Sequence, residues 1–423
     1  MSQKPTKFYQ LSREERLEQL KDNLTTESYQ QYLTQSLLDD AVANSLIENQ
    51  VSQFPLPLGV ARNFIVNQQA YTIPMVVEEP SVIAACSNAA KIFQPDGFTT
   101  SCEESLMTGQ IILTDVSHLE DAKAHLLKHF SEIQQLAQDC HPSIVKRGGG
   151  LKTLDVRFFS DHVTATDYLT VYLTVDTKDA MGANIVNTIL EGVTPLVADL
   201  TSGTVLMSIL SNYTTQSLVT ANCAIDIDLI PNKSAVAQKD LAQKIVAASQ
   251  YAKLDPYRAA THNKGIMNGV DSVIIATGND PRAVEAGIHA YAARNGRYEG
   301  LSDWKIQDNQ LVGTLTLPLS IGTVGGAISV LPLAKANLDL LGNPTALELA
   351  QIVVAVGLAQ NFAALKALVS EGIQKGHMAL HASSLAIQVG ATGPEIEQVA
   401  TALRQESQMN TMIATKILAE LRR

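Results

Sequence analysis

The sequence predicts an α+β fold, in which a large mixed unit of helices and strands carries an inserted ferredoxin-like βαββαβ unit and ends in a small helical unit. Three observations predict this fold. Strand-like and helix-like stretches between Leu106 and Leu210 follow one another in the order βαββαβ. No GxGxxG follows the first of these strands, so the inserted unit is not a Rossmann unit. From Gly376 onward the pattern is helical.

The chain is long for one compact core, since it has 423 residues. We expect a large unit made of residues 1–104 and 213–372. The inserted unit takes residues 105–212, and residues 373–423 form a helical C-terminal flap.

Helices are predicted first, over residues 12–50, where Ser12 and Glu15 form a capping box and apolar residues recur at helical spacing. A strand follows at Tyr71–Val77. Pro80 then opens a helix, because proline is well tolerated at a first helical position.

The inserted unit begins with the strand GQIILTDV, after Leu106. Pro195 is expected to kink or split its second helix. Its other predicted elements are a helix over His118–Leu136, strands over Leu154–Phe159 and Tyr168–Val175, a helix over Ala180–Leu200 and a strand over Val205–Leu210.

The second part of the large unit alternates like a strand at residues 213–229 and continues with an amphipathic helix over Val236–Ala252. Val273–Ala276 is predicted to be a short buried strand, because it is rich in β-branched residues and lies between Gly269 and Gly278. LVGTLTLPLS is a further strand, followed by the glycine-rich loop IGTVGGAIS. Residues 346–373 are apolar almost all round, which indicates a buried helix pair or one long core helix.

The composition limits the possible partners. A net charge of −11 argues against nucleic acid and anionic membrane, so a polyanionic ligand must be met by local basic clusters. Four cysteines without CxxC spacing indicate reduced thiols in a cytoplasmic protein. There is no signal-peptide core, and no run approaches the ~18 apolar residues of a membrane span. We therefore expect a soluble protein.

Polar side chains that could carry chemistry concentrate between Asp255 and Gly287. They are Arg258, His262, Asn263, Lys264, Asn268 and Asp280. If the fold brings Lys264 and Asp280 together, they could hold a developing oxyanion and set its proton supply. The alternative is a short strand flanked by solvated loops.

Four other motifs are open to two interpretations each. Glu78 and Glu79 lie at a strand-to-helix turn, where they could serve a site or complement a helix dipole. DAMGAN, residues 179–184, could bind phosphate through free backbone N–H groups or be an ordinary helix start. KRGGG, residues 146–150, could be a basic phosphate loop or a linker. His377 and His381 share a helix face, which fits a metal site or plain surface, although no third ligand presents itself.

One family matches most of these motifs. DPYRAATHNKGIMNG followed by ATGND resembles the class II (bacterial, soluble) HMG-CoA reductases. Four further motifs match in the same order, and together they cover nearly the whole chain: IEN at 47–49, VVEEPSV at 76–82, DAMGAN at 179–184 and GHMALHA at 376–382. The family's ENVIG differs here at Gln50 and Ser52, which weakens a CoA-side role for this loop.

The resemblance implies reduction of HMG-CoA to mevalonate and coenzyme A with two NAD(P)H, through a hemithioacetal and mevaldehyde. Lys264 would stabilise the oxyanion, His377 would protonate the departing thiolate, and Glu79 would protonate the aldehyde oxygen. Asp280 would tie Lys264 to Glu79 by hydrogen bonds. Substrate-binding roles fall to Arg258, which suits a carboxylate, and to Ser81, Asn268 and Asn49.

Cofactor-binding roles fall to Asp179, Met181, Gly182 and Asn184. NAD-linked members carry an aspartate where this chain has His141, and Lys146 and Arg147 follow. The missing negative charge predicts a preference for NADPH, with NADH as the alternative. The family also implies a homodimer or a dimer-based assembly with its active site at the interface. No metal site is expected, because His377 and His381 lack a third ligand.

Two other functions compete with this interpretation. One is a metal-dependent hydrolase built on His377 and His381. The other is a catalytically silent protein that binds CoA or a nucleotide, which loss of Glu79, Lys264, Asp280 or His377 would favour. All four residues are present.

Overall fold

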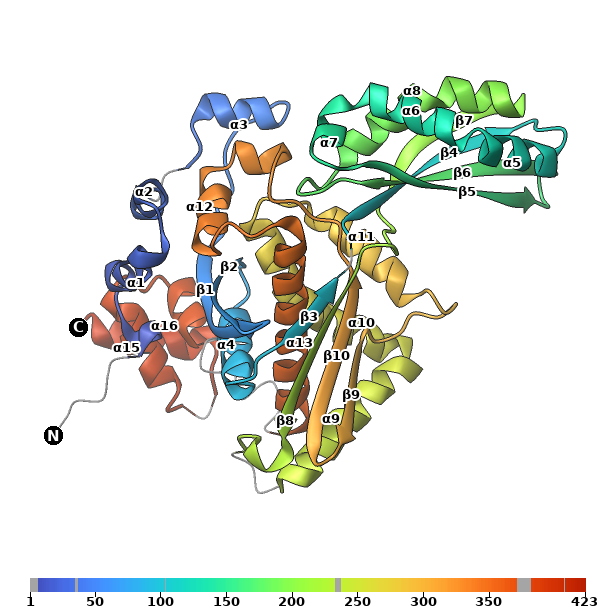
Figure 1. Ribbon diagram of the computed structural model, residues 1–423. Coiled ribbons are helices and arrows are strands. Elements are labelled where there is room, and N and C mark those ends of the chain that lie inside the picture. The colour runs from blue at the N-terminus through green and yellow to red at the C-terminus, as the bar shows by residue number, and fades with distance from the viewer. Residues whose placement is uncertain (1–6, 35–36, 103, 233–236, 371–381, 407) are drawn as a thin grey trace.

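The molecule, described from a computed structural model, has three parts. In Figure 1 the large unit occupies the centre, the inserted sheet with its helices lies at the upper right, and the C-terminal helices lie at the lower left. The structure describes residues 7–34, 37–102, 104–232, 237–370, 382–406 and 408–423.

The large unit is built around one long helix, α13 (Ala346–Val369), which decides between the two alternatives for this stretch. Thr345 begins it with a capping box to Glu348, and almost every side chain from Leu349 to Phe362 is buried. Within the described residues, α13 alone is long and apolar enough to cross a membrane, contrary to the expectation that no run approaches that length. Because 67% of that apolar window is buried inside the molecule, α13 serves here as the core helix.

Helix α10 (Pro256–Ala276) crosses α13 at close range. A Cβ on Gly269 would lie 3.0 Å from the Cβ of Gln360 and 3.1 Å from Val356 Cγ1, so this glycine permits close helix packing and does not end an element. The strand predicted at Val273–Ala276 is wrong, since these residues form the last turn of α10. Val273 and Ile274 are buried in the core, whereas Ile275 is exposed.

An antiparallel four-stranded sheet contributes to the same core, in the order β3-β8-β10-β9. Its strands are β3 (Thr99–Cys102), β8 (Leu218–Asp226), β10 (Gln310–Pro318) and β9 (Ser302–Gln307). A separate hairpin, β1 (Leu58–Val66) with β2 (Gln69–Val76), packs against helix α4 (Val82–Ile92). Strand β1 was not predicted, because it begins directly after a proline-containing stretch.

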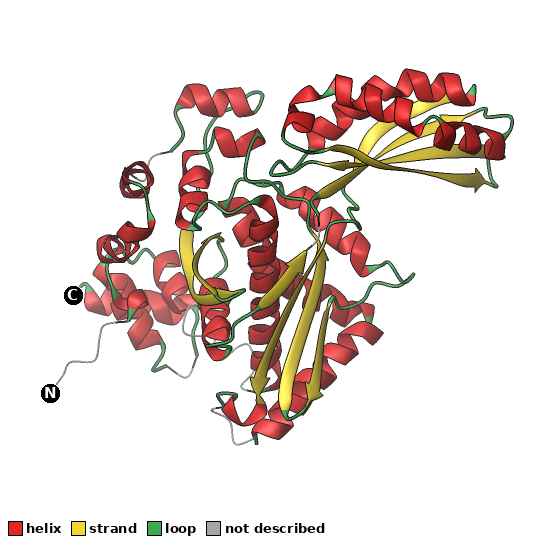
Figure 2. Ribbon diagram, viewed as in Figure 1, coloured by secondary structure: helices red, strands yellow, loops and turns green. Residues whose placement is uncertain are grey.

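The inserted unit has the predicted order of elements and a core of its own. Its antiparallel sheet has the order β5-β6-β4-β7, and Figure 2 shows its helices gathered on one face. The strands are β4 (Leu106–Thr114), β5 (Gly150–Asp161), β6 (Thr166–Asp176) and β7 (Thr204–Ser211). The helices are α5 (Leu119–Lys128), α6 (Phe130–Cys140), α7 (Pro142–Lys146) and α8 (Ala183–Thr201).

Two helix predictions for this unit need correction. The single helix predicted over His118–Leu136 is two helices, which break at His129. Helix α8 continues through Pro195 without splitting.

The remaining helices cover the large unit and form the C-terminal lobe. They are α1 (Arg13–Leu20), α2 (Thr26–Thr34), α3 (Asp40–Leu46), α9 (Gln238–Leu254), α11 (Pro281–Ala292), α12 (Pro332–Leu340), α15 (Pro394–Leu403) and α16 (Thr411–Leu421). Short 3-10 turns occur at Phe8–Gln10, Lys21–Asn23, Ile227–Leu229 and Gly326–Ser329.

Candidate functional site

Two predicted catalytic residues meet across the fold. Lys264, near the middle of α10, places its Nζ 2.6 Å from Oε2 of Glu79, which lies in the turn between β2 and α4. The two residues are 185 positions apart in the chain, so only the tertiary fold joins them. Both side chains stay accessible, with 59% of Lys264 and 34% of Glu79 exposed. A cation and a carboxylate are therefore held together where a substrate can reach them.

The turn that carries Glu79 has a strained backbone. Ser81, the residue before α4, has a φ of 76° and a ψ of −20°, in the left-handed region that serine rarely adopts. Its side chain makes no capping hydrogen bond, so local bonding does not explain the strain. Such strain persists where a site requires a particular backbone direction. Asn49, the other predicted binding residue in a turn, also has a positive φ, of 54°.

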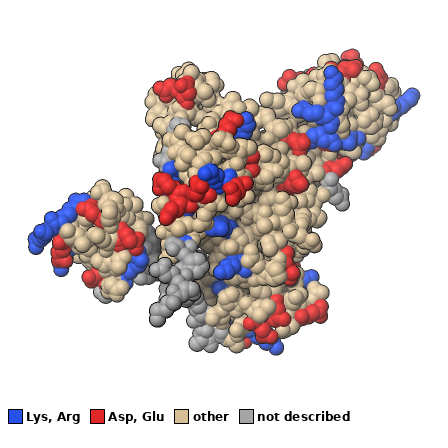
Figure 3. Space-filling model, turned by 60° about the vertical axis from the view of Figure 1, so that its left-hand side comes forward, with Lys and Arg blue, Asp and Glu red and all other residues tan. Residues whose placement is uncertain are grey.

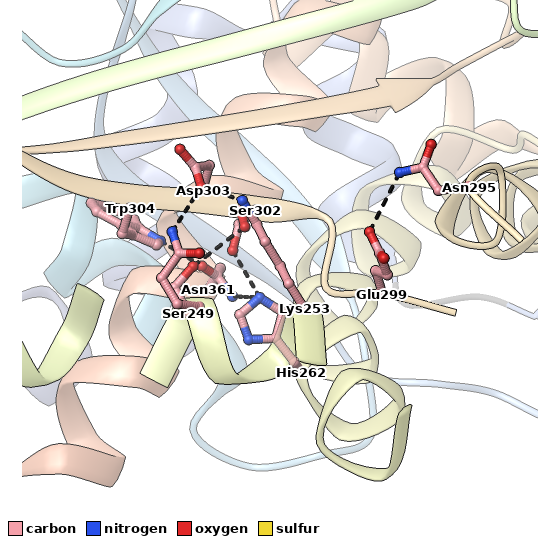
Figure 4. Close-up of polar contacts among 10 residues, drawn as sticks. Ser249, Lys253, His262, Asn295, Glu299, Ser302, Asp303, Trp304 and Asn361 are labelled. Carbon is pink, nitrogen blue, oxygen red and sulfur yellow. Dashed lines mark hydrogen bonds and ion pairs between the residues drawn. The ribbon is translucent and has the colours of Figure 1, made fainter. Parts of the chain in front are cut away.

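The buried face of α10 is anchored by a polar network (Figure 4). His262 Nε2 lies 2.8 Å from Ser302 Oγ and 3.1 Å from Asn361 Nδ2. Because the Trp304 indole N–H can only donate, and donates to Asn361 Oδ1 at 2.8 Å, the Asn361 amide group must turn its N–H to His262. His262 Nε2 is then an acceptor, and the ring proton sits on Nδ1.

The surroundings of His262 favour its neutral form. Burial lowers the pKa of its imidazole to about 4, and the positive charge of Arg258 acts in the same direction. Its Nδ1 is buried without a hydrogen-bond partner among the described residues. The neighbouring Asn263 donates to Glu299 O at 2.9 Å and accepts from Leu301 N at 3.0 Å. Together they fix the rotation of α10 and so direct Lys264 outward.

The sequence motifs do not predict Ser302, Trp304 and Asn361 as partners of this network. One signal was present for Asn361, because an asparagine inside a helix that is apolar almost all round must find a buried polar partner. The same part of α10 carries two predicted substrate-binding residues. Arg258 is half-buried, and burial lowers the pKa of its guanidinium. Asn268 follows Lys264 by four positions, on the same side of the helix.

Asp280 does not join this pair in the described structure. It is the N-cap of α11, where Oδ1 accepts from Arg282 N at 2.9 Å and Ala283 N at 3.2 Å. Among the described residues Asp280 makes no hydrogen bond or ion pair with Lys264 or Glu79, so its tie to that pair stays a prediction.

The predicted cofactor loop, residues 179–184, lies at the start of α8. Gly182 is the N-cap residue with a φ of 100°, and a Cβ there would be 2.2 Å from Thr177 Cγ2, so only glycine fits. No side chain caps this helix, which leaves its first N–H groups available to an anion, with Asn184 in the first turn. Asp179 does not cap α8 but accepts from Ala346 N at 2.9 Å, at the start of α13.

A second set of predicted cofactor residues flanks α7. His141 lies between α6 and α7, with Nδ1 3.2 Å from Ser143 Oγ, and Lys146 and Arg147 are exposed at the far end. The carboxylate of Asp139 accepts from Gln135 at 3.0 Å. Figure 3 shows Lys and Arg side chains gathered on the lobe at the upper right, in a chain that is acidic as a whole.

His377 and His381 lie outside the described residues, so the structure places neither of them. In the ranges that it does describe, no three His, Cys, Asp or Glu side chains lie close enough to hold a metal ion.

Comparison with known proteins identifies the family. A model of the hydroxymethylglutaryl-coenzyme A reductase family matches residues 12–382. A 3-hydroxy-3-methylglutaryl-coenzyme A reductase of Archaeoglobus fulgidus is 45% identical over 100% of this chain and 95% of its own length. A probable reductase of Borreliella burgdorferi is 34% identical over 85% of this chain and 81% of its own.

Solved structures agree with the sequence matches. A 3-hydroxy-3-methylglutaryl-coenzyme A reductase from Streptococcus pneumoniae has a TM-score of 0.83 and 46% identity, covering 98% of this chain and 99% of that chain. The class II reductase of the same organism, bound to NADPH in open conformations, has a TM-score of 0.82 and 46% identity, with 98% and 100% covered. This chain therefore belongs to the hydroxymethylglutaryl-coenzyme A reductase family.

Proposed function

We propose that this chain is a cytoplasmic enzyme of the mevalonate pathway, which makes isoprenoid precursors, and that it reduces (S)-HMG-CoA to (R)-mevalonate and coenzyme A with two NADPH. The observation that carries the proposal is the accessible Lys264–Glu79 pair, at 2.6 Å. Family membership supports the reaction, and nothing in the comparisons favours a metal-dependent hydrolase or a silent binding protein.

The residues divide the chemistry between them. NADPH, when bound, supplies the hydride for each of the two reductions. The ammonium of Lys264 stabilises the oxyanion that forms on the thioester carbonyl. When the resulting hemithioacetal collapses, the C–S bond breaks, and His377 gives a proton to the thiolate. Glu79 then gives a proton to the aldehyde oxygen as it becomes the alcohol of mevalonate.

Substrate binding rests on the same helix. Arg258 is suited to pair with the free carboxylate of the HMG group through two parallel hydrogen bonds. Asn268 would orient the pocket, and Ser81 and Asn49 would approach the substrate from the strained turn and from the turn after α3.

The chain's own residues fit NADPH. Uncapped N–H groups at the start of α8, with Gly182 allowing close approach, suit a pyrophosphate. Lys146 and Arg147 offer positive charge to the 2′-phosphate, and His141 brings no negative charge to repel it. A relative from Streptococcus pneumoniae is described as bound to NADPH.

We further propose that the active site is completed by a second copy of the chain. Asp280 makes no contact with Lys264 or Glu79 of its own chain among the described residues, and we assign it to the Lys264–Glu79 pair of the partner. An apolar groove of about 570 Å³ between α2–α3, α10 and α12 supports an interface. Val51 and Phe54 nearby in the sequence are 95% and 90% exposed, which a second copy would relieve.

One assay tests the proposed function. Purified protein is expected to oxidise two NADPH for each HMG-CoA consumed and to release one CoA thiol. The rate should persist in EDTA, which separates the reductase from a metal-dependent hydrolase. Thiol release without NADPH oxidation would overturn the proposal.

A further inference from the structure

Asn279, the residue before Asp280, clasps a neighbouring loop with both ends of its amide. Its Nδ2 donates to Gly322 O at 3.0 Å, and its Oδ1 accepts from Gly322 N at 2.7 Å. We call residues 319–325 the bridging loop. An asparagine amide carries one donor edge and one acceptor edge, so it pairs with a peptide unit much as a backbone strand does.

The other side of the bridging loop is joined to the cofactor loop. Thr323 N donates to Asp179 O at 2.8 Å, and Ser320 Oγ donates to Met181 O at 3.3 Å. A Cβ on Gly322 would lie 2.4 Å from Met181 N, so the two backbones are in direct contact.

From these contacts we propose that Asn279 is a positioning residue, which makes the loop bearing Asp280 and the cofactor loop one rigid unit. The inference rests on the proposed function. In a dimer, this unit would present the carboxylate of Asp280 and the dinucleotide of one chain together to the Lys264–Glu79 pair of the other. The clasp is independent of the substrate-binding face of α10, because its contacts lie beyond that helix's C-terminus.

Replacing Asn279 with alanine tests the coupling. For Asn279→Ala we expect the Kd for NADPH to rise roughly three- to tenfold and kcat to fall by a similar factor, as for mutations along a coupling network. The KM for HMG-CoA should stay at the wild-type value, because HMG-CoA is held through α10. Intrinsic fluorescence titration of the dimer with NADPH alone measures the Kd without turnover.

Asn263→Ala is the matched control. Asn263 makes the same two-ended clasp with a backbone, to Glu299 O and Leu301 N, but beside Lys264. This variant should lose stability and raise the KM for HMG-CoA, with the Kd for NADPH unchanged. Of these two constants, Asn279→Ala would then change only the Kd for NADPH, and Asn263→Ala only the KM for HMG-CoA. A general loss of stability cannot produce this pair of results.

Gly322→Ala disturbs the contact between the bridging loop and the cofactor loop directly, because its new methyl group would collide with Met181 N. It should weaken NADPH binding, and the double variant should lose less than the two single effects combined. If Gly322→Ala does not fold, Asn279→Asp replaces it: the new carboxylate oxygen would repel Gly322 O, so the Kd should rise at least as much as in Asn279→Ala. A wild-type Kd for NADPH in folded Asn279→Ala would overturn the inference. Failure of the wild-type protein to oxidise NADPH with HMG-CoA would instead overturn the proposed function.

Discussion

A single side chain, His141, occupies the position that we expect to set the cofactor preference. It lies between α6 and α7 with Lys146 and Arg147 exposed five and six residues later. The nearest acidic residue in the sequence, Asp139, accepts a hydrogen bond from Gln135, so part of its charge is satisfied locally. A 2′-phosphate would therefore meet more positive than negative charge here.

Replacing His141 with aspartate should shift the preference from NADPH toward NADH. The new carboxylate would repel the 2′-phosphate and accept hydrogen bonds from a ribose 2′-hydroxyl. The measurement is kcat/KM for both cofactors in each protein, with His141→Asn as the uncharged control. A wild-type preference for NADH would contradict the assignment.

Asp271, on α10, makes the stability of the protein depend on pH. Burial and the neighbouring carboxylate of Glu285 raise the pKa of Asp271 from 3.8 to about 8, and its Oδ1 is buried without a described partner. The folded state thus favours the protonated form. Protonation of Asp271 therefore stabilises the folded protein. This contribution to the free energy of unfolding is fully present below about pH 4 and is lost as the pH rises through about 8.

Asp271→Asn should remove this fall in stability with rising pH, because the amide stays neutral. We expect the difference in melting temperature, variant minus wild type, to grow in favour of the variant between pH 5 and pH 9. Thermal unfolding followed by circular dichroism measures it. A difference that stays constant with pH would exclude Asp271 as the titrating group.

At the scale of elements, α10 and α13 act as one support for Lys264. Glycines at their crossing bring the helices close, and the His262–Asn361–Trp304 network fixes their rotation. The network is buried, so its groups have no water to replace a lost partner.

Asn361→Ala should lower the free energy of unfolding by about 1–3 kcal/mol, because it leaves the Trp304 N–H buried without its acceptor. Denaturant unfolding measures the change. Asn222→Ala is the control, since Asn222 bonds Thr314 at an exposed position of the sheet and should change stability by less than about 0.5 kcal/mol. Equal losses in the two variants would refute the role given to the network.

The elements that were predicted correctly are those whose hydrophobic pattern extends over many consecutive residues. The order of the inserted unit and the core helix are of this kind. The strand predicted at Val273–Ala276 was wrong because β-branched residues between glycines look alike in a buried strand and in the last turn of a buried helix. Only the packing of Gly269 against Val356 distinguishes them.

Sequence motifs identified the candidate site residues, but they could not predict which of these residues lie close together in the fold. The Lys264–Glu79 pair follows from the fold, and the structure shows Asp280 capping α11 without a contact to that pair among the described residues. His377 lies outside the described residues and stays a prediction.

At the scale of the whole molecule, sites shared between two chains can be tested by complementation. Lys264→Ala alone should reduce turnover by roughly 10²–10³, as loss of one oxyanion donor does elsewhere. Asp280→Asn should also be impaired. A heterodimer of the two variants would contain one site with both residues intact, so purified, doubly tagged heterodimers should recover roughly half of wild-type turnover.

If Lys264 and Asp280 acted within one chain, every site of that heterodimer would carry a defect. No recovery in a verified heterodimer would therefore contradict the shared site. Each homodimer, mixed with wild-type protein in the same ratio, serves as the control for subunit exchange.

The point at which the inserted unit joins the large unit has a consequence for folding kinetics. Ser217 Oγ donates to Leu106 O at 2.6 Å and accepts from Leu106 N at 2.7 Å, although the residues are 111 positions apart. Pairing β3 with β8 must close that long loop, and the entropy of closure grows with the logarithm of its length. If the inserted unit folds first on its own core, its two ends arrive already side by side, and the large sheet pairs as though it were joined by a short turn.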